Sequence, residues 1–94
     1  WSDPMEEDGF SSSKRGVVMR FGPDVTERFL QNNKLELLVR SHQEQQEGYK
    51  VMHNGKCITI FSASNYKGQE NRGAILMLSF NEDGSILSKD FLQF

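Results

Sequence analysis

The sequence has little of what marks several large classes of protein. Its longest apolar run, residues 74–78, is far shorter than the roughly 20 residues of a membrane-spanning helix. Lys and Arg number 11 against 13 Asp and Glu, so no basic excess exists for binding nucleic acid or an anionic membrane. We therefore expect neither a nucleic acid nor a membrane as a partner.

Cysteine is almost absent too. Cys57 has no second cysteine in the chain with which to form a disulfide, and no Asn-x-Ser/Thr glycosylation sequon occurs. Both features are typical of a protein from a reducing, intracellular compartment. We expect the cytoplasm, with the nucleus as a second compartment.

Aromatic residues make up 11% of the 94 residues, which is enough to supply a folded core. A chain of this length is either one small domain or part of a larger one. Patterns for nucleotide-binding loops, zinc proteases and serine hydrolases (GxxxxGK[ST], HExxH, GxSxG) are absent. No complete catalytic constellation is therefore visible in the sequence.

One helix is predicted near the middle of the first half of the chain. Residues 2–16 form a polar stretch, and the run of residues 11–16 within it is predicted to form a loop. Pro23, preceded by Gly22 and followed by Asp24, suits the first turn of a helix, and Asn32-Asn33 suits its end. Val25, Phe29 and Leu30 repeat at helical spacing.

Four or five strands are predicted after the helix. Asn54-Gly55 between two strand-like segments is the strongest short-range signal for a hairpin. Residues 74–80 are apolar almost throughout, which predicts a strand covered on both faces. The predicted strands are residues 35–39, 49–53, 56–61, 74–80 and 85–94, and the fold class is mixed α/β.

Three residues are candidates for a functional site. His42 follows a predicted strand, where a neutral imidazole can bind a transition metal or simply form a hydrogen bond at the strand end. Arg15 beside Gly16 can bind a phosphate or carboxylate, or be a solvated loop charge. Tyr66, in a loop rich in Ser and Asn, can offer its hydroxyl to an oxyanion or cover a sheet edge.

Two other residues are expected to be structural. His53 abuts the Asn54-Gly55 turn and is predicted to be solvated. Arg40, at the end of an apolar strand, is predicted to be a paired and partly buried charge rather than a ligand contact.

Taken in order, several short motifs resemble the C-terminal part of the catalytic domain of the metal-dependent phosphoprotein phosphatases, the PPP family of serine/threonine phosphatases. The motifs cover nearly the whole chain: Trp1-Ser2-Asp3-Pro4, Lys14-Arg15-Gly16-Val17, Phe21-Gly22-Pro23-Asp24-Val25, Arg40-Ser41-His42-Gln43, Glu47-Gly48-Tyr49, Thr59-Ile60-Phe61-Ser62-Ala63, Asn65-Tyr66 and Asn71-Arg72-Gly73-Ala74. Ser64 and Asn71-Arg72-Gly73-Ala74 are most similar to the EF-hand-containing subclass. The alternative is the subclass with tetratricopeptide repeats, to which residues 14–17 and 22–26 are also similar.

The resemblance implies a fold, a reaction and site residues. The fold would be the C-terminal portion of the calcineurin-like metallophosphatase β-sandwich flanked by helices. The reaction would be hydrolysis of phosphoserine and phosphothreonine in proteins by a hydroxide held between two divalent metal ions (Mn, Fe or Zn) about 4 Å apart. His42 corresponds to a metal ligand that also lies at the substrate. Arg15 corresponds to the arginine that grips the phosphate, and Tyr66 to a tyrosine in a loop overhanging the metals.

The other ligands of the family lie in upstream motifs that residues 1–94 do not contain. The sequence opens on Trp1, inside a family motif, so we expect residues 1–94 to be a partial catalytic domain whose upstream half is missing. Its partners would be a phosphoprotein substrate and that missing half. We expect the isolated segment to be inactive, and the alternative is a non-catalytic, β-rich binding or scaffold module derived from the same fold.

Overall fold

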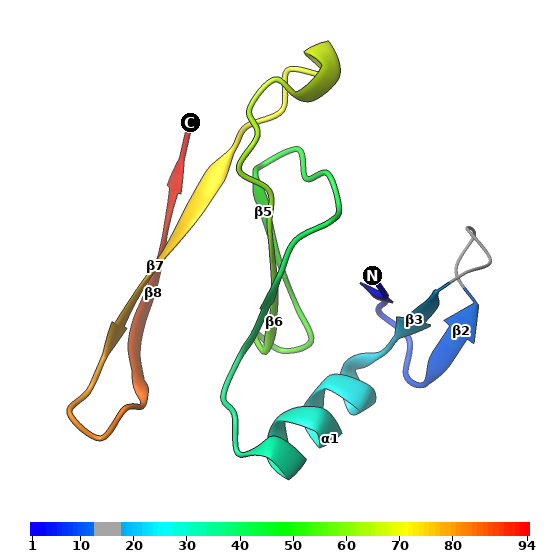
Figure 1. The fold of residues 1–94 in the computed structure, drawn as a ribbon, viewed down its shortest axis with the longest axis vertical. Coiled ribbons are helices and arrows are strands. Elements are labelled where there is room, and N and C mark those ends of the chain that lie inside the picture. The colour runs from blue at the N-terminus through cyan, green and yellow to red at the C-terminus, as the bar shows by residue number, and fades with distance from the viewer. Residues whose placement is uncertain (13–17) are drawn as a thin grey trace. The chain divides into compact units, whose positions relative to one another are not determined.

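The structure, a computed structural model, describes residues 1–12 and 18–94 (Figure 1). In this part of the chain one α-helix and eight strands occur, which confirms the α/β class. The elements are β1 (Asp3–Pro4), β2 (Phe10–Ser12), β3 (Met19–Phe21), α1 (Pro23–Asn33), β4 (Leu38–Arg40), β5 (Tyr49–Met52), β6 (Cys57–Ile60), the 3₁₀ turn η1 (Tyr66–Gly68), β7 (Ala74–Phe80) and β8 (Ile86–Gln93).

The strands form three small sheets, with orders β1-β3-β2, β4-β6-β5 and β7-β8. The five predicted strands correspond to β4 through β8. The prediction of a loop over residues 11–16 was wrong at residues 11 and 12, which belong to β2, since a strand of three residues is too short to show an alternating pattern. Residues 13–16 lie outside the described part of the chain. The chain divides into two compact units. Unit 1 is Trp1–Arg40 with Val51–Ile58, and unit 2 is Ser41–Lys50 with Thr59–Phe94.

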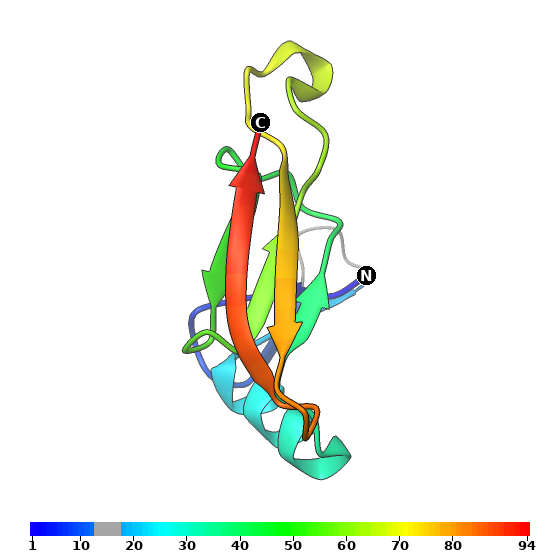
Figure 2. The same cartoon turned by 90° about the vertical axis from the view of Figure 1, so that its left-hand side faces the viewer.

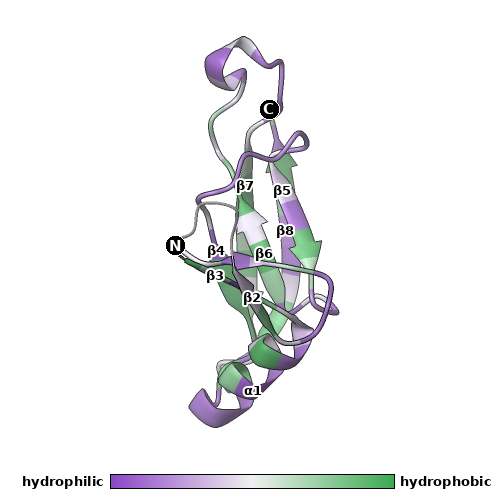
Figure 3. Ribbon diagram, turned by 90° about the vertical axis from the view of Figure 1, so that its right-hand side faces the viewer, coloured by the Kyte–Doolittle hydropathy of each residue, from purple (hydrophilic) through white to green (hydrophobic). Residues whose placement is uncertain are grey.

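The helix of unit 1 begins and ends where the sequence predicts. Gly22 is its N-cap, and Pro23 occupies the first turn, where a missing N–H leaves no hydrogen bond unmade. Asp24 accepts a hydrogen bond from the Gly9 N–H at 2.8 Å, and this bond lowers the pKa of its carboxyl group. The helix ends at Asn33, and Lys34 adopts a left-handed conformation with φ 54°. Figure 3 shows apolar and hydrophilic residues on different parts of α1.

The core of unit 1 contains a buried histidine. His53 is only 7% exposed, with Nδ1 2.7 Å from Thr26 Oγ1 and Nε2 2.7 Å from the Met5 carbonyl oxygen. A carbonyl can only accept, so Nε2 donates to it, and in the tautomer that carries its one proton on Nε2 the Thr26 hydroxyl donates to Nδ1. The prediction that His53 is solvated was wrong, because the Asn54-Gly55 turn packs His53 against α1 and the segment around Met5.

An ion pair joins two strands of unit 1. Arg40 Nη2 lies 2.7 Å from Asp3 Oδ1, and both side chains are about nine-tenths buried (11% and 10% exposed). The prediction that Arg40 is a paired, partly buried charge is confirmed. A second pair, Lys56 with Glu27 at 2.8 Å, is half exposed and contributes little to stability.

Unit 2 contains the long hairpin of β7 and β8, a twisted two-stranded ribbon (Figure 2). Its residues pair from Ala74 with Gln93 to Phe80 with Ile86. The prediction that residues 74–80 are covered on both faces was wrong for this chain. Ile75 and Met77 are 42% and 48% exposed, whereas Ala74 is fully buried.

Two glycines of unit 2 allow separate segments to approach closely. Gly48 has φ +83°, and a Cβ atom there would lie 2.5 Å from the Gly73 carbonyl carbon and 2.7 Å from the Ala74 nitrogen. A Cβ atom on Gly73 would lie 2.7 Å from the Ser62 carbonyl oxygen. The Phe61 N–H donates to the Gly48 carbonyl at 2.8 Å, which holds the segments together.

Replacing Thr26 with valine should destabilise the chain, because the shape is kept while the buried Nδ1 of His53 loses its hydrogen-bond partner. The expected cost is about 1–3 kcal/mol in the free energy of unfolding, measured by urea titration. Thr26→Ser keeps the hydroxyl and is the matched control. Equal losses for the two variants would contradict the hydrogen-bond argument.

Replacing Gly48 with alanine should destabilise the chain more than replacing Gly84. Both glycines have positive φ, +83° and +90°, but a Cβ atom at Gly84 meets nothing within 4 Å. Gly84→Ala therefore measures the left-handed strain alone, about 1–2 kcal/mol. Gly48→Ala adds a backbone clash, which we expect to cost roughly 1–3 kcal/mol more in a urea titration. A Gly48→Ala variant as stable as Gly84→Ala would show that the segments can separate freely.

Candidate functional site

His42 has an unusual backbone conformation. It lies two residues beyond the end of β4, is exposed, and has φ +85°. Left-handed conformations are uncommon for residues other than glycine, and this φ exceeds the usual left-handed value of about +57°. Such strain persists where neighbouring structure holds the backbone in place, and it is enriched at functional sites.

Tyr66 lies in the loop of residues 62–73, which we call the Tyr66 loop, between β6 and β7 (Figure 1). Three of its non-glycine residues have positive φ: Asn65 (49°), Lys67 (53°) and Glu70 (59°). Each such residue costs about 1–2 kcal/mol relative to an ordinary conformation. The loop is thus strained at several positions and needs compensating contacts.

Asn71 supplies the largest set of those contacts. Its side-chain Oδ1 accepts the Tyr66 N–H at 2.7 Å, and its Nδ2 donates to the carbonyls of Ala63 at 2.8 Å and Arg72 at 3.0 Å. Its own carbonyl accepts the Asn65 N–H at 2.8 Å. Asn71 is 6% exposed, so these groups are shielded from water.

The ring of Tyr66 is partly exposed and packs edge-to-face against Phe61, with 5.2 Å between the centroids. Lys67 Nζ lies 5.1 Å from the centre of the Tyr66 ring, within the range of a cation–π contact. The Tyr66 loop therefore presents a phenol and an ammonium group side by side.

Two of the three predicted site residues belong to the same compact unit, and the third is not among the described residues. His42 and Tyr66 both belong to unit 2. The Arg72 N–H at the end of the Tyr66 loop donates to the Gln46 carbonyl at 2.9 Å, which connects that loop to the segment that follows His42. Arg15 lies outside the described residues.

The described residues do not form a metal centre by themselves. No group of three or more His, Cys, Asp or Glu side chains suited to a metal occurs in residues 1–12 and 18–94. Both ring nitrogens of His53 are engaged, and burial raises the pKa of the Cys57 thiol, which disfavours the thiolate that metals bind. His42 alone does not make a metal centre. Within the described part of the chain, no helix has the length and apolar character needed to cross a membrane.

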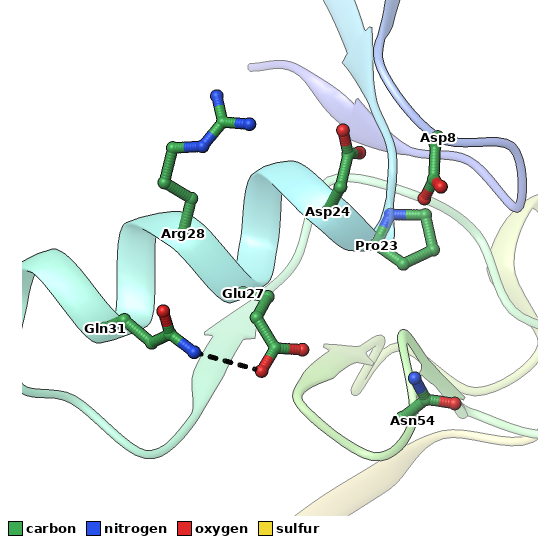
Figure 4. A pocket seen from close by; sticks show the side chains of 7 residues that line it. All are labelled: Asp8, Pro23, Asp24, Glu27, Arg28, Gln31 and Asn54. Atoms are coloured by element: carbon green, nitrogen blue, oxygen red, sulfur yellow. Dashed lines mark hydrogen bonds between the residues drawn. The ribbon is translucent and has the colours of Figure 1, made fainter.

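An open pocket lies beside the start of α1 in unit 1 (Figure 4). None of the predicted site residues lines it. Its walls carry three carboxylates against one guanidinium, so it does not favour a phosphate. The lining residues are Asp8, Pro23, Asp24, Glu27, Arg28, Gln31 and Asn54.

Sequence reasoning did not find Asn71 as an organising residue. In the sequence, Asn71 is one position of the motif Asn71-Arg72-Gly73-Ala74, and the motif by itself indicates no role for its amide. An amide shortly before a glycine, at the end of a loop rich in Ser and Asn, was the available signal.

The chain is similar in sequence to curated serine/threonine phosphatases, while no family model matches it. It is 59% identical over 78 residues to serine/threonine-protein phosphatase T of Trypanosoma brucei brucei, covering 81% of the chain and 16% of that protein. It is 48% identical over 95 residues to serine/threonine-protein phosphatase 5 of Homo sapiens, covering 100% of the chain and 18% of that protein. The chain thus spans less than a fifth of the length of these relatives.

These relatives bear on the subclass. They are phosphatases 5 and T, the subclass with tetratricopeptide repeats. The prediction that the chain is most similar to the EF-hand-containing subclass was therefore wrong. The alternative prediction, the subclass with tetratricopeptide repeats, is the one that the relatives support. The first prediction gave most weight to Ser64 and the Asn71 motif, a few positions in one loop, whereas the comparisons cover most of the chain.

A solved structure agrees with the sequence comparisons. The chain matches the structure of a protein serine/threonine phosphatase from Saccharomyces cerevisiae with similarity to human phosphatase PP5, with a TM-score of 0.84 and 37% identity. The match covers 100% of this chain and 31% of that one. The fold is thus that of part of a phosphatase domain, and the chain belongs to the PPP family of serine/threonine protein phosphatases.

Proposed function

We propose that residues 1–94 are the C-terminal segment of a catalytic domain, and that the whole protein hydrolyses phosphoserine and phosphothreonine in proteins. The observation that carries the proposal is the 48% identity to a phosphatase 5 across 100% of the chain. The strained backbone and exposed side chain of His42 support it, because the resemblance assigns a metal ligand to this position.

His42 would contribute one imidazole ligand and stand beside the bound substrate. Two divalent ions (Mn, Fe or Zn) supply, when bound, an activated water and positive charge for the phosphate. The remaining ligands would come from parts of the protein outside this chain, which are therefore partners of the segment. The activity is proposed for the whole domain and not for residues 1–94 alone.

Arg15 and Tyr66 would bind the substrate phosphate. A guanidinium can hold two phosphate oxygens at once and offset the charge that develops in the transition state. The Tyr66 hydroxyl can donate to an oxygen of the same group. Lys67, exposed beside Tyr66, adds a positive charge that would favour acidic residues near the phosphorylated side chain. We propose the cytoplasm as the compartment in which such substrates are met.

Residues 1–94 alone should show no phosphatase activity, because the described residues provide one metal ligand where a two-metal centre needs several. The test is to purify residues 1–94, add Mn²⁺, and assay a chromogenic phosphomonoester. Metal-dependent turnover that His42→Ala abolishes would overturn the inactivity of the segment. In the whole protein, the same substitution should remove most of the activity.

Arg15→Ala in the whole protein should lower kcat/KM for a phosphopeptide by roughly 10²- to 10³-fold, since it removes a donor to the developing charge. Arg28→Ala removes an equal charge from an exposed position on α1 and is the matched control. Steady-state kinetics on both variants decide the question. An Arg15→Ala loss no larger than the Arg28→Ala loss would remove Arg15 from the site.

A further inference from the structure

We propose that Asn71 is a positioning residue that sets the place of Tyr66 at the phosphatase site. The inference rests on the proposed function and extends it to a residue that does not touch the substrate. It starts from one observation: a nearly buried amide binds the backbone N–H of Tyr66.

The Tyr66 loop does not hold its shape through backbone preference. Tyr66 is flanked on both sides by left-handed residues, Asn65 at φ 49° and Lys67 at φ 53°. Glu70, next to Asn71, is left-handed as well, at φ 59°. A backbone with this much strain relaxes unless other contacts determine it, so the conformation at Tyr66 depends on those contacts.

The Asn71 side chain has both the hydrogen-bonding groups and the size that are needed to hold the backbone around Tyr66. It uses one acceptor and both donors, binding the loop at Tyr66, Ala63 and Arg72. Aspartate has the same shape but no donor in its ionised form, so its carboxylate would face two carbonyl oxygens. Alanine leaves all three backbone groups without this partner.

The contacts continue from Asn71 toward both candidate residues. On one side, the Tyr66 backbone is fixed and its ring rests against Phe61. On the other, the neighbouring Arg72 N–H binds the carbonyl of Gln46, in the segment that follows His42. Asn71 and its neighbour Arg72 therefore connect the backbone at Tyr66 with the segment that follows His42, the proposed metal ligand. All of these residues belong to unit 2.

The first test measures hydrogen exchange at the Tyr66 amide in the whole protein. Asn71→Asp and Asn71→Ala should speed this exchange, because the protecting acceptor is repelled or removed. Asn81→Asp makes the same chemical change at an exposed turn of unit 2, where the amide donates to Ser85 Oγ, and should leave the Tyr66 amide unchanged. An unchanged Tyr66 amide in both Asn71 variants would overturn the proposal.

The second test is a double-mutant cycle on phosphopeptide hydrolysis by the whole protein. Asn71→Asp should lower kcat/KM roughly 10- to 100-fold, the loss expected from misplacing a group at a site by about 1 Å. If Asn71 acts through the Tyr66 hydroxyl, Asn71→Asp in a Tyr66→Phe background should add less than about threefold. The same full loss in both backgrounds would show a merely structural role and overturn the proposal.

The two tests separate this inference from the proposed function. If the unmutated whole protein has no phosphatase activity, the proposed function fails and the positioning role fails with it. Exchange at the Tyr66 amide would still show in that case whether Asn71 holds the loop.

Discussion

His53 lies inside unit 1 with both ring nitrogens hydrogen-bonded, and the packing of that unit depends on those two bonds. One joins the hairpin turn to Thr26 on α1, and the other joins it to the backbone at Met5. Few large apolar side chains among its described residues are fully buried, so the cohesion of the unit depends on satisfied polar groups as well as apolar contact. Asn71 has a comparable place in unit 2, where one amide binds three backbone groups of the Tyr66 loop.

The sequence predicted elements whose signal is local. Gly22, Pro23 and Asp24 specify the start of α1 through the proline's fixed φ and an acid in the first turn, and Asn54-Gly55 specifies the hairpin through two residues that tolerate positive φ. Strands β1 to β3 were not predicted, since two or three residues show no period. The burial of His53 was missed because it depends on residues 27 and 48 positions away in the chain.

Prediction of the candidate site had a different limit. Composition and spacing left His42, Arg15 and Tyr66 each with a simple structural alternative, and the family resemblance is what singled them out. The structure adds the strain at His42 and the contacts around Tyr66. No local pattern could reveal Asn71, because an asparagine in a polar loop is ordinary until the chain turns back and presents the Tyr66 N–H and two carbonyls to it.

The backbone strain at His42 can be compared with the conformation of a nearby glycine, Gly48. Gly48, six residues later, has nearly the same φ, +83° against +85°, and there a side chain would strike the backbone of Gly73 and Ala74. Glycine at position 42 would relieve the left-handed strain, but it would also remove the imidazole. A strained backbone that carries a side chain is easiest to understand where that side chain has a task. His42 is exposed, and the metal-binding role proposed above would be one such task.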